Sequence, residues 1–444
     1  MTFVFKQIFG GRKMNLFGSM KIENNELTIG GIKSTDLVKE YGTPLYVMDE
    51  GLIRQNCNEY YKYFKCDNSS NRVAYAGKAF LTLEMCKIIN EENLSLDVVS
   101  GGELFIAHKS GFPLDKVMFH GNNKTLDEIE LGVKLGVGRF VVDNYYEMEE
   151  LNRIAASYNK IQKVFLRITP GIEAHTHEYI KTGQVDSKFG FAPVGNMIED
   201  AINKSINLPN IELSGLHCHI GSQIFEIEPY EDAVEIMLGL IKKIKQNTGY
   251  LIKELDLGGG FGIYYNRGDK PKTTKEYCEA ILNKVDEVCS RTGLSKPSLI
   301  IEPGRSIVGN SGITLYTVGS IKDIPGVRKY VSVDGGMSDN IRPALYHAEY
   351  ECMLANKVEK DLKETVTICG KCCESGDILL NDVNISTPQS NDILSVMTTG
   401  AYGYSMSNNY NKIPRPPVVM VKDNKERLIC RRETYEDLIQ NEII

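Results

Sequence analysis

Several features that define other protein classes are missing from this sequence. No apolar run is long enough to span a bilayer, which excludes a membrane-spanning helix. The net charge of −7 leaves no positive excess, so neither a nucleic acid nor a membrane is expected as a partner. Low-complexity tracts are also missing, and the only repeat is an alternation of strand-like and helix-like segments.

The N-terminus lacks the hydrophobic segment and the cleavage site of a signal peptide. Its first residues, Met1–Lys6, are short and mixed in character, and Gly10-Gly11-Arg12-Lys13 follows them. We interpret residues 1–14 as an extension, with Met14 as the natural start.

The 11 cysteines are odd in number and scattered, which disfavours a disulfide framework. We therefore expect a reducing, cytoplasmic location, with most of these thiols in the core. Cys369-Gly370-Lys371-Cys372 matches the C-x-x-C pattern, but it has no second pair nearby and no thioredoxin-like βαβ pattern around it. A redox or zinc role is disfavoured, and no metal is expected.

The middle of the chain predicts a barrel. With 444 residues, 42% of them hydrophobic, the chain has room for two or three domains and a sizeable core. Short runs rich in Val, Ile and Leu alternate with segments that carry apolar residues at helical spacing. Eight such units over roughly 250 residues predict a (β/α)8 TIM-type barrel. The expected strands are Val73–Lys78, Ser95–Ser100, Lys116–Gly121, Arg139–Asp143, Lys163–Thr169, Ile211–Ile220, Glu254–Gly258 and Ser298–Pro303.

After Ser306 the pattern changes to short β-like runs joined by polar or glycine- and proline-rich turns, which predicts a mostly-β second domain. Lys21–Ile29 is a further candidate strand pair that joins it. We place the barrel at residues 45–305 and the β-rich domain at residues 15–44 and 306–444. The candidate strands after the barrel are Gly312–Gly319, Tyr330–Asp334, Thr365–Cys369, Asp392–Met397 and Val418–Lys422, and a helix is expected at Thr434–Asn441.

A barrel places its active site at the C-terminal ends of its strands, and unusual residues occur at five of these ends. A lysine that closes an apolar strand is costly unless it has a partner or a purpose. Because all strand ends of one kind meet at one mouth, we expect these residues to converge. They are Lys78 after the first strand, Arg167 near the end of the fifth, His217 and His219 after the sixth, Gly258-Gly259-Gly260 after the seventh, and Glu302 and Arg305 after the eighth.

The glycine run Gly258–Gly262 presents backbone N–H groups without side-chain cover, which is typical of a phosphate-binding nest. A tight turn explains the same glycines equally well. Ser222 would add a hydroxyl donor. His217 and His219 have strand spacing and face the same side, but a metal needs a third ligand. A flat imidazole stacked on a flat cofactor ring, or a hydrogen-bonded core histidine, fits them as well.

Glu302 precedes Pro303-Gly304-Arg305. A carboxylate beside a pyridine nitrogen would keep that nitrogen protonated, which makes the ring a strong electron sink. A structural Glu–Arg pair at the barrel rim is the alternative.

Three positions in the second domain also suggest chemistry. Cys373-Glu374 pairs a thiol that could deliver a proton with a carboxylate that could bind an amine; a buried thiol in a turn is the alternative. Arg342 is suited to a bidentate grip on a carboxylate, or else is a solvated arginine. Tyr402 is either a core aromatic or a cofactor contact.

Together these motifs resemble the fold-type III pyridoxal-phosphate-dependent decarboxylases, and among them those that act on diaminopimelate. The resemblance covers the chain from about residue 15 to the C-terminus. Five motifs in order are far more specific than any one alone. They are Tyr75-Ala76-Gly77-Lys78-Ala79, His217-Cys218-His219-Ile220-Gly221-Ser222-Gln223, Glu302-Pro303-Gly304-Arg305-Ser306, Cys373-Glu374-Ser375-Gly376-Asp377 and Gly400-Ala401-Tyr402-Gly403-Tyr404-Ser405-Met406.

The resemblance implies a role for each candidate residue. Lys78 is expected to carry pyridoxal 5'-phosphate as an imine, His219 to stack on its ring, and Glu302 to pair with the ring nitrogen. The residues expected to hold the phosphate are Ser222, Gly258, Gly259, Gly260, Gly304, Arg305 and Tyr402. The residues expected to bind the substrate are Arg305, Arg342, Tyr346, Glu374 and Tyr402.

The resemblance also implies a head-to-tail homodimer in which the partner subunit supplies Cys373 and Glu374. One departure is Lys371-Cys372 before this pair, where the family is expected to have a proline and another residue. That leaves the local turn geometry open but keeps the Cys-Glu pair. Residues 181–190 are interpreted as either a lid or a plain surface loop.

The activity implied is decarboxylation of meso-diaminopimelate at its D-centre to L-lysine and carbon dioxide, with Cys373 or Lys78 returning the proton. Three alternatives remain: the same chemistry on ornithine, arginine or carboxynorspermidine; a non-catalytic pyridoxal-phosphate binding protein; and an inactive paralogue. The second domain, and the presence of Lys78, Glu302 and Cys373 together, argue against the last two.

Overall fold

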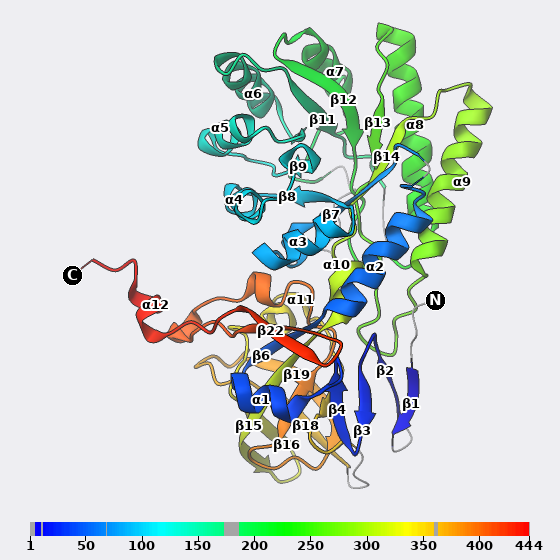
Figure 1. The fold of residues 1–444 in the computed structure, drawn as a ribbon. Helices are drawn as coiled ribbons and strands as arrows, with labels where there is room; N and C mark the ends of the chain where they lie inside the picture. The colour runs from blue at the N-terminus through cyan, green and yellow to red at the C-terminus, as the bar shows by residue number, and fades with distance from the viewer. Residues whose placement is uncertain (1–4, 10–11, 68, 173–185, 359–362, 444) are drawn as a thin grey trace. The chain divides into compact units, whose positions relative to one another are not determined.

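The computed structural model describes residues 5–9, 12–67, 69–172, 186–358 and 363–443 (Figure 1). The chain divides into two compact units. The barrel unit comprises residues 56–263 and 270–306. The sheet unit comprises the described residues up to Gln55, the short segment 264–269, and the described residues from Ile307 onward.

The barrel unit contains a closed barrel of eight parallel strands, so the predicted fold class is confirmed. Each strand pairs with the next one in the chain, and β14 pairs with β7 to close the ring. The strands are β7 (Arg72–Ala76), β8 (Ser95–Val98), β9 (Val117–Phe119), β10 (Arg139–Val142), β11 (Gln162–Arg167), β12 (Ile211–His217), β13 (Glu254–Asp256) and β14 (Ser298–Ile301).

Helices α3 to α9 follow the barrel strands β7 to β13 in turn, and α2 precedes β7 (Figure 1). Their ends follow the usual capping chemistry. The side chains of Thr125 and Thr273 each form a reciprocal capping box, while Gly136 and Gly293 end the same two helices in the left-handed conformation. The helices are α2 (Glu50–Tyr63), α3 (Leu83–Glu91), α4 (Gly101–Ser110), α5 (Leu126–Leu135), α6 (Tyr145–Ser157), α7 (Met197–Asn207), α8 (Glu228–Thr248) and α9 (Thr274–Thr292).

Apolar side chains fill the barrel, so it is a packed core rather than a pore. One buried cluster joins residues of five strands, Ala74, Met118, Val141, Phe165 and Ile300.

The N-terminal end of the barrel is held by charge. Glu254, the first residue of β13, accepts two hydrogen bonds from Arg139, the first residue of β10, at 2.6 and 2.7 Å. Arg72, the first residue of β7, lies 3.4 Å from the same carboxylate. These bonds tie together strands on different sides of the ring at the end away from the expected active site.

The sheet unit is built mainly of antiparallel strands. Its largest sheet has nine strands, in the order β19-β18-β16-β15-β6-β21-β22, with β20 paired to β15 and β17 to β20. These are β6 (Leu45–Asp49), β15 (Gly312–Ile324), β16 (Arg328–Val333), β17 (Cys352–Leu354), β18 (Lys363–Cys369), β19 (Ile378–Ser386), β20 (Ile393–Val396), β21 (Val418–Lys422) and β22 (Lys425–Cys430).

Smaller elements complete the sheet unit. A three-stranded sheet, β3-β4-β5, contains the strand pair expected within Lys21–Ile29. The remaining elements are the hairpin β1 (Phe5–Phe9) and β2 (Arg12–Leu16), β3 (Lys21–Glu23), β4 (Glu26–Ile29), β5 (Ile32–Lys33), α1 (Ser34–Tyr41), α11 (Arg342–Tyr346) and α12 (Tyr435–Ile439), and α10 (Arg305–Val308) follows β14. No helix in the described part of the chain is long and apolar enough to cross a membrane.

The start of the barrel differs from the predicted span of residues 45–305. Residues 45–49 form β6, which pairs with β15 on one side and β21 on the other. All five of its residues are buried. In sequence, such an apolar run is compatible with a barrel strand and with a central strand of a sheet. Only its pairing with β15 and β21, which lie far away in the chain, decides between the two.

A buried ion pair behind the barrel mouth provides a stability test. The ammonium of Lys124 lies 2.6 Å from Glu147 and donates to the carbonyls of Val141 and Gly121, at 2.9 and 3.0 Å. Lys124→Met leaves the buried Glu147 unpaired, so we expect it to destabilise the barrel by about 3–5 kcal/mol.

Urea unfolding followed by far-UV circular dichroism measures this loss. Lys134→Met, which changes an exposed lysine on α5, serves as the control and should leave the unfolding midpoint nearly unchanged. Equal midpoints for the two variants would contradict a structural role for the pair.

Candidate active site

Lys78 does not close the first barrel strand as predicted. The strand β7 ends at Ala76, and Lys78 lies in a single 3-10 turn, Gly77–Ala79. Its neighbours on both sides are buried while Lys78 itself is exposed. The turn leaves no room for a side chain at Gly77, where a Cβ would lie 2.9 Å from the carbonyl of Asp97. Because Lys78 is exposed, its ammonium group does not have to be removed from water. It lies at the barrel mouth and forms no ion pair with any described residue.

The glycine run after β13 packs too closely for side chains. A Cβ at Gly259 would lie 2.1 Å from the carbonyl oxygen of Glu302, and one at Gly260 would lie 2.4 Å from that of Gly221. Gly258 and Gly260 also have positive φ angles of 68° and 101°, which side chains disfavour. The glycines are therefore required by the backbone itself.

The N–H groups of the glycine run divide into two kinds. Gly258 donates to the Asp256 carboxylate at 2.9 Å, and Gly259 donates to Nδ1 of His219 at 3.2 Å. No described residue accepts a hydrogen bond from the N–H of Gly260. Of the three glycines, Gly260 thus has the N–H that is open to an anion.

Ser222 lies beside this run. Its loop is fixed to the glycine loop by the hydrogen bond from Ile224 to the carbonyl of Gly260, at 2.9 Å. Its hydroxyl accepts a hydrogen bond of 2.9 Å from the guanidinium of Arg305. Gly304, just before Arg305, packs against the end of β7, where a Cβ would lie 2.9 Å from that of Ala76. The structure thus brings together the expected phosphate-binding residues of the barrel unit.

His219 has the surroundings expected of a neutral, flat ring. Burial lowers the pKa of His219 well below its ordinary value, and the positive charges of Lys78 and Arg167 lower it further. Its Nδ1 accepts from Gly259, so its tautomer is fixed with the proton on Nε2. Arg167, the last residue of β11, lies 3.8 Å from Asp143 and its guanidinium lies 4.1 Å from the ring centre of Phe189.

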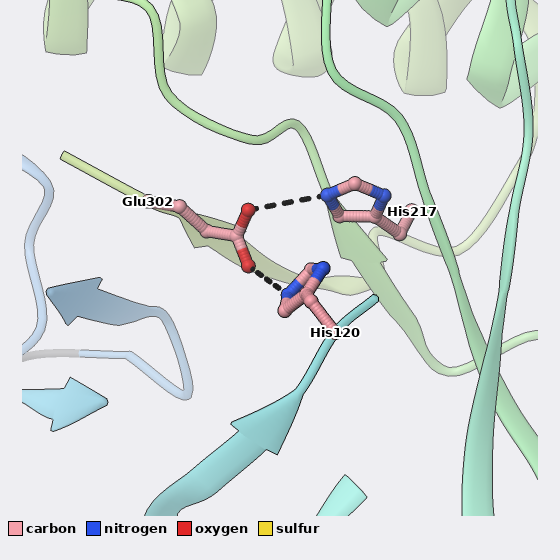
Figure 2. A group of neighbouring side chains, drawn as sticks. All are labelled: His120, His217 and Glu302. Carbon is pink, nitrogen blue, oxygen red and sulfur yellow. Dashed lines mark hydrogen bonds and ion pairs between the residues drawn. The ribbon is translucent and has the colours of Figure 1, made fainter. Parts of the chain in front are cut away.

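Glu302 lies just beyond β14 and meets two histidines (Figure 2). Its Oε1 lies 2.6 Å from Nε2 of His120, and its Oε2 lies 3.1 Å from Nε2 of His217. All three side chains are buried. Burial by itself raises the pKa of Glu302, but the two imidazoles outweigh burial and hold it well below its usual range.

Other acids near Glu302 behave in the opposite way. Burial raises the pKa of Asp256 well above its ordinary value, with the charge of Glu302 as the next cause. Burial likewise raises the pKa of Asp97, although His120 acts in the other direction. Glu302 is therefore the carboxylate that keeps its negative charge here, as a partner of a protonated ring nitrogen must.

Sequence reasoning missed His120, Asp97 and Asp256. His120 directly follows β9, and Asp256 ends β13, so the strand-end rule that identified Lys78 and Glu302 also points to them. Asp97 lies within β8, where nothing but its charge in an apolar run marks it.

In the sheet unit, Arg342 is enclosed by tyrosines. Its guanidinium is 5.2, 5.7 and 5.9 Å from the ring centres of Tyr265, Tyr350 and Tyr402. It donates hydrogen bonds to the hydroxyls of Tyr265, at 3.2 Å, and Tyr350. Burial lowers the pKa of Arg342, but these two tyrosines outweigh it and raise the pKa above its usual value. Only 8% of Arg342 is exposed, and no described carboxylate pairs with it.

Cys373 and Glu374 lie on an exposed turn rather than in the core. The turn is anchored at its base by the buried carboxylate of Asp377, which accepts from the N–H groups of Cys372 and Met337 at 2.8 and 2.7 Å. The alternative of a buried thiol at Cys373 is thus wrong. Within the pattern C-x-x-C, burial raises the pKa of Cys372 to about 11, which makes it a poor thiolate.

Two further expectations can be placed. Tyr346 ends α11 and is half-buried, as is Tyr402, whose backbone has a φ of 63°. The segment of residues 181–190, interpreted as a lid or a plain surface loop, lies partly outside the described residues. Its last residue, Gly190, donates to Asp143 at 2.9 Å.

The fold and the site define a class of enzyme. A parallel barrel that has an exposed lysine after its first strand, a glycine nest after its seventh, and an ionised glutamate after its eighth matches the needs of a phosphorylated pyridine cofactor. The close-packed glycines and the charge of Glu302 fit pyridoxal 5'-phosphate.

Comparison with known proteins gives the family. The model of the pyridoxal-dependent decarboxylase, pyridoxal binding domain, matches residues 50–309. Diaminopimelate decarboxylase of Bacillus subtilis is 48% identical over 95% of this chain and 96% of the relative. That of Halalkalibacterium halodurans is 49% identical over 93% and 94%. A crystal structure of the M. jannaschii diaminopimelate decarboxylase with L-lysine superimposes with a TM-score of 0.90 and 36% identity over 96% of this chain and 98% of that one. The chain therefore belongs to the pyridoxal-dependent decarboxylase family.

The glycine nest gives a test of cofactor binding. Gly259→Ala forces a methyl group against the Glu302 carbonyl, so we expect the affinity for pyridoxal phosphate to fall by about 100-fold or more. Fluorescence titration of the apoenzyme measures it. Gly239→Ala is the control, because it adds a methyl group to an exposed, open position on α8 and should change nothing. Wild-type affinity in Gly259→Ala would refute the assignment of the nest.

Proposed function

We propose that this chain decarboxylates meso-diaminopimelate at its D-centre, which yields L-lysine and carbon dioxide as the last step of lysine biosynthesis. The observation that carries the substrate is the buried cation Arg342, which has no carboxylate partner among the described residues. The relatives at 48–49% identity are diaminopimelate decarboxylases, and a structural relative binds L-lysine.

Within the barrel unit, each side chain has one task toward the cofactor. Lys78 holds it covalently, Glu302 pairs with its ring nitrogen, and His219 lies against its ring. We assign the phosphate to Ser222, Arg305 and the N–H of Gly260, in a cradle shaped by the close-packed Gly258, Gly259 and Gly304, together with Tyr402 of the sheet unit. Pyridoxal phosphate, when bound, supplies the electron sink for the carbanion left by departing carbon dioxide.

The substrate is selected at its distal end. Diaminopimelate carries a second carboxylate, which we assign to Arg342 and Arg305, with Tyr346 and Tyr402 beside it. The planar guanidinium of Arg342 is oriented by Tyr265 and can form two hydrogen bonds to a carboxylate. Ornithine, arginine and carboxynorspermidine place a cation at that end, which would leave a buried arginine without an anion and is disfavoured.

The proton returned to Cα comes from the Sγ of Cys373 or the Nζ of Lys78. Glu374, next to Cys373, binds the distal amine of the substrate. Both side chains are exposed on a turn whose base is fixed by Asp377, so the pair is firmly presented to a neighbouring molecule. This exposure supports a head-to-tail homodimer in which each subunit completes the other's active site.

We place the reaction in the cytoplasm. Six of the 11 cysteines are buried in the protein as thiols. Such thiols persist in a reducing compartment.

Product analysis tests the function. Purified protein with pyridoxal phosphate is given meso-diaminopimelate, ornithine and arginine separately. We expect lysine from the first and no product from the others, and no activity in Lys78→Ala. Release of putrescine or agmatine would overturn the substrate assignment, and activity in Lys78→Ala would overturn the cofactor assignment.

Arg342→Met removes the proposed partner of the distal carboxylate. We expect kcat/KM for meso-diaminopimelate to fall about 100-fold, because a charged hydrogen bond is lost, while cofactor affinity is kept. Arg342→Lys should recover part of the loss. Steady-state kinetics provides the measurement, with the exposed Arg328→Met as the control. If Arg342→Met retains wild-type kcat/KM, the substrate assignment is wrong.

Subunit mixing tests site sharing. Lys78→Ala and Cys373→Ala chains are each expected to be inactive or nearly so. After exchange, a mixed dimer contains one site free of both changes, so about a quarter of wild-type activity should return under random pairing, since half the dimers are mixed. No recovery, when native mass spectrometry shows that the chains have exchanged, would exclude a shared site.

A further inference from the structure

Glu302 alone would be enough to pair with a ring nitrogen, yet it also contacts two buried histidines, His120 and His217. Two imidazoles from separate strands each meet a different oxygen of the same carboxylate, at 2.6 and 3.1 Å (Figure 2). The rings of His120 and His217 pack edge to face, with centres 4.8 Å apart. The Glu302 carboxylate therefore has its plane fixed by contacts on both oxygens.

The charges around the cluster make this fixation necessary. Asp97 on β8 lies 3.7 Å from His120, and Asp256 on β13 also interacts with Glu302. Lys78 and Arg167 provide positive charge from the turn after β7 and from the end of β11. Among three buried acids, the one that stays ionised must be the one with the best hydrogen-bond donors.

The protonation of His217 follows from its surroundings. Burial lowers the pKa of His217 to about 4, so the ring is neutral near pH 7. Its Nδ1 is buried and has no hydrogen-bond partner among the described residues, whereas its Nε2 meets Glu302. The single proton of a neutral ring therefore belongs on Nε2, where it stabilises the carboxylate.

We propose that His120 and His217 are positioning residues that hold Glu302 as an oriented anion facing the cofactor's ring nitrogen: His217 donates from Nε2 to one carboxylate oxygen, and His120 lies against the other as an ion-pair partner. The inference rests on the proposed function. Each carboxylate oxygen keeps a second lone pair, so the ring N–H can still be accepted.

A bound metal ion explains the cluster less well than the positioning of Glu302 by two histidines does. The three ligating atoms lie within 4.8 Å of one another, as a zinc site requires. However, two atoms bound to one zinc at about 2.0–2.1 Å in a tetrahedral site lie roughly 3.3 Å apart. The 2.6 Å contact of His120 is a hydrogen-bond distance, and the charges of Lys78 and Arg167 disfavour a further cation.

The test observes the ring nitrogen itself. Pyridoxal phosphate labelled with ¹⁵N is bound to wild-type protein and to His120→Leu and His217→Leu, and the nitrogen resonance is recorded by solid-state NMR. We expect a protonated position in wild type and a shift toward the unprotonated position in both variants. kcat should fall roughly tenfold to a hundredfold with KM changed less than about twofold.

Substitution of each histidine by Gln or Asn distinguishes a positioning role from a role in folding. Gln places its N–H donor near Nε2 of histidine, whereas Asn is one bond too short to reach Glu302. At positions 120 and 217 we therefore expect Gln to restore the protonated resonance and Asn to fail, and this comparison remains if the Leu variants do not fold. His108→Leu, on the exposed side of α4, is the control and should match wild type.

An unchanged protonated resonance in both Leu variants, or in both Asn variants, would overturn the inference. So would Gln variants that behave as Asn does. Failure of the proposed function has a different result, because wild-type protein would then form no lysine from meso-diaminopimelate, whereas the nitrogen resonance is recorded without substrate.

Discussion

The arrangement of side chains at the barrel mouth depends on the buried negative charge of Glu302, whose removal from water is energetically unfavourable. A carboxylate removed from water is stable only where hydrogen bonds and opposite charges replace its hydration. His120 and His217 lie against its two oxygens (Figure 2), while burial raises the pKa values of Asp97 and Asp256. The closed barrel makes this arrangement possible, because strands far apart in sequence end at the same ring. Burial of one charge thus fixes the protonation of its neighbours and the chemistry open to a bound pyridine.

In the sheet unit, the buried positive charge of Arg342 has a different kind of environment. Arg342 is buried among the faces and hydroxyls of Tyr265, Tyr350 and Tyr402, which interact with a cation without neutralising it. A carboxylate in place of these tyrosines would have satisfied Arg342 permanently. The tyrosines orient the guanidinium and leave it available to an anion, as a specific substrate pocket requires.

The sequence allowed the barrel and most of its functional strand ends to be predicted, because the alternation of short apolar strands and amphipathic helices is a local signal. Glu302 and Gly258–Gly260 follow from the same rule. The predicted first strand, which ends at Lys78, runs two residues past the observed end at Ala76, since an alanine-rich strand end and a buried turn have the same composition. The contacts of Arg342 with Tyr265 could not be predicted, because the two residues are 77 positions apart and only the folded chain brings them together. The same limit applies to β6, whose place is decided by its partners β15 and β21.

Asp377 connects two parts of the sheet unit that serve different purposes. Its carboxylate holds the turn that bears Cys373, and through Met337 it also holds the loop that leads into Arg342. The fit is tight, since a Cβ at Gly370 or Gly336 would lie 2.2 or 2.5 Å from Asp377. Any displacement of the loop that leads into Arg342 would therefore reach the turn that bears Cys373 through one side chain, so the two segments are expected to move together.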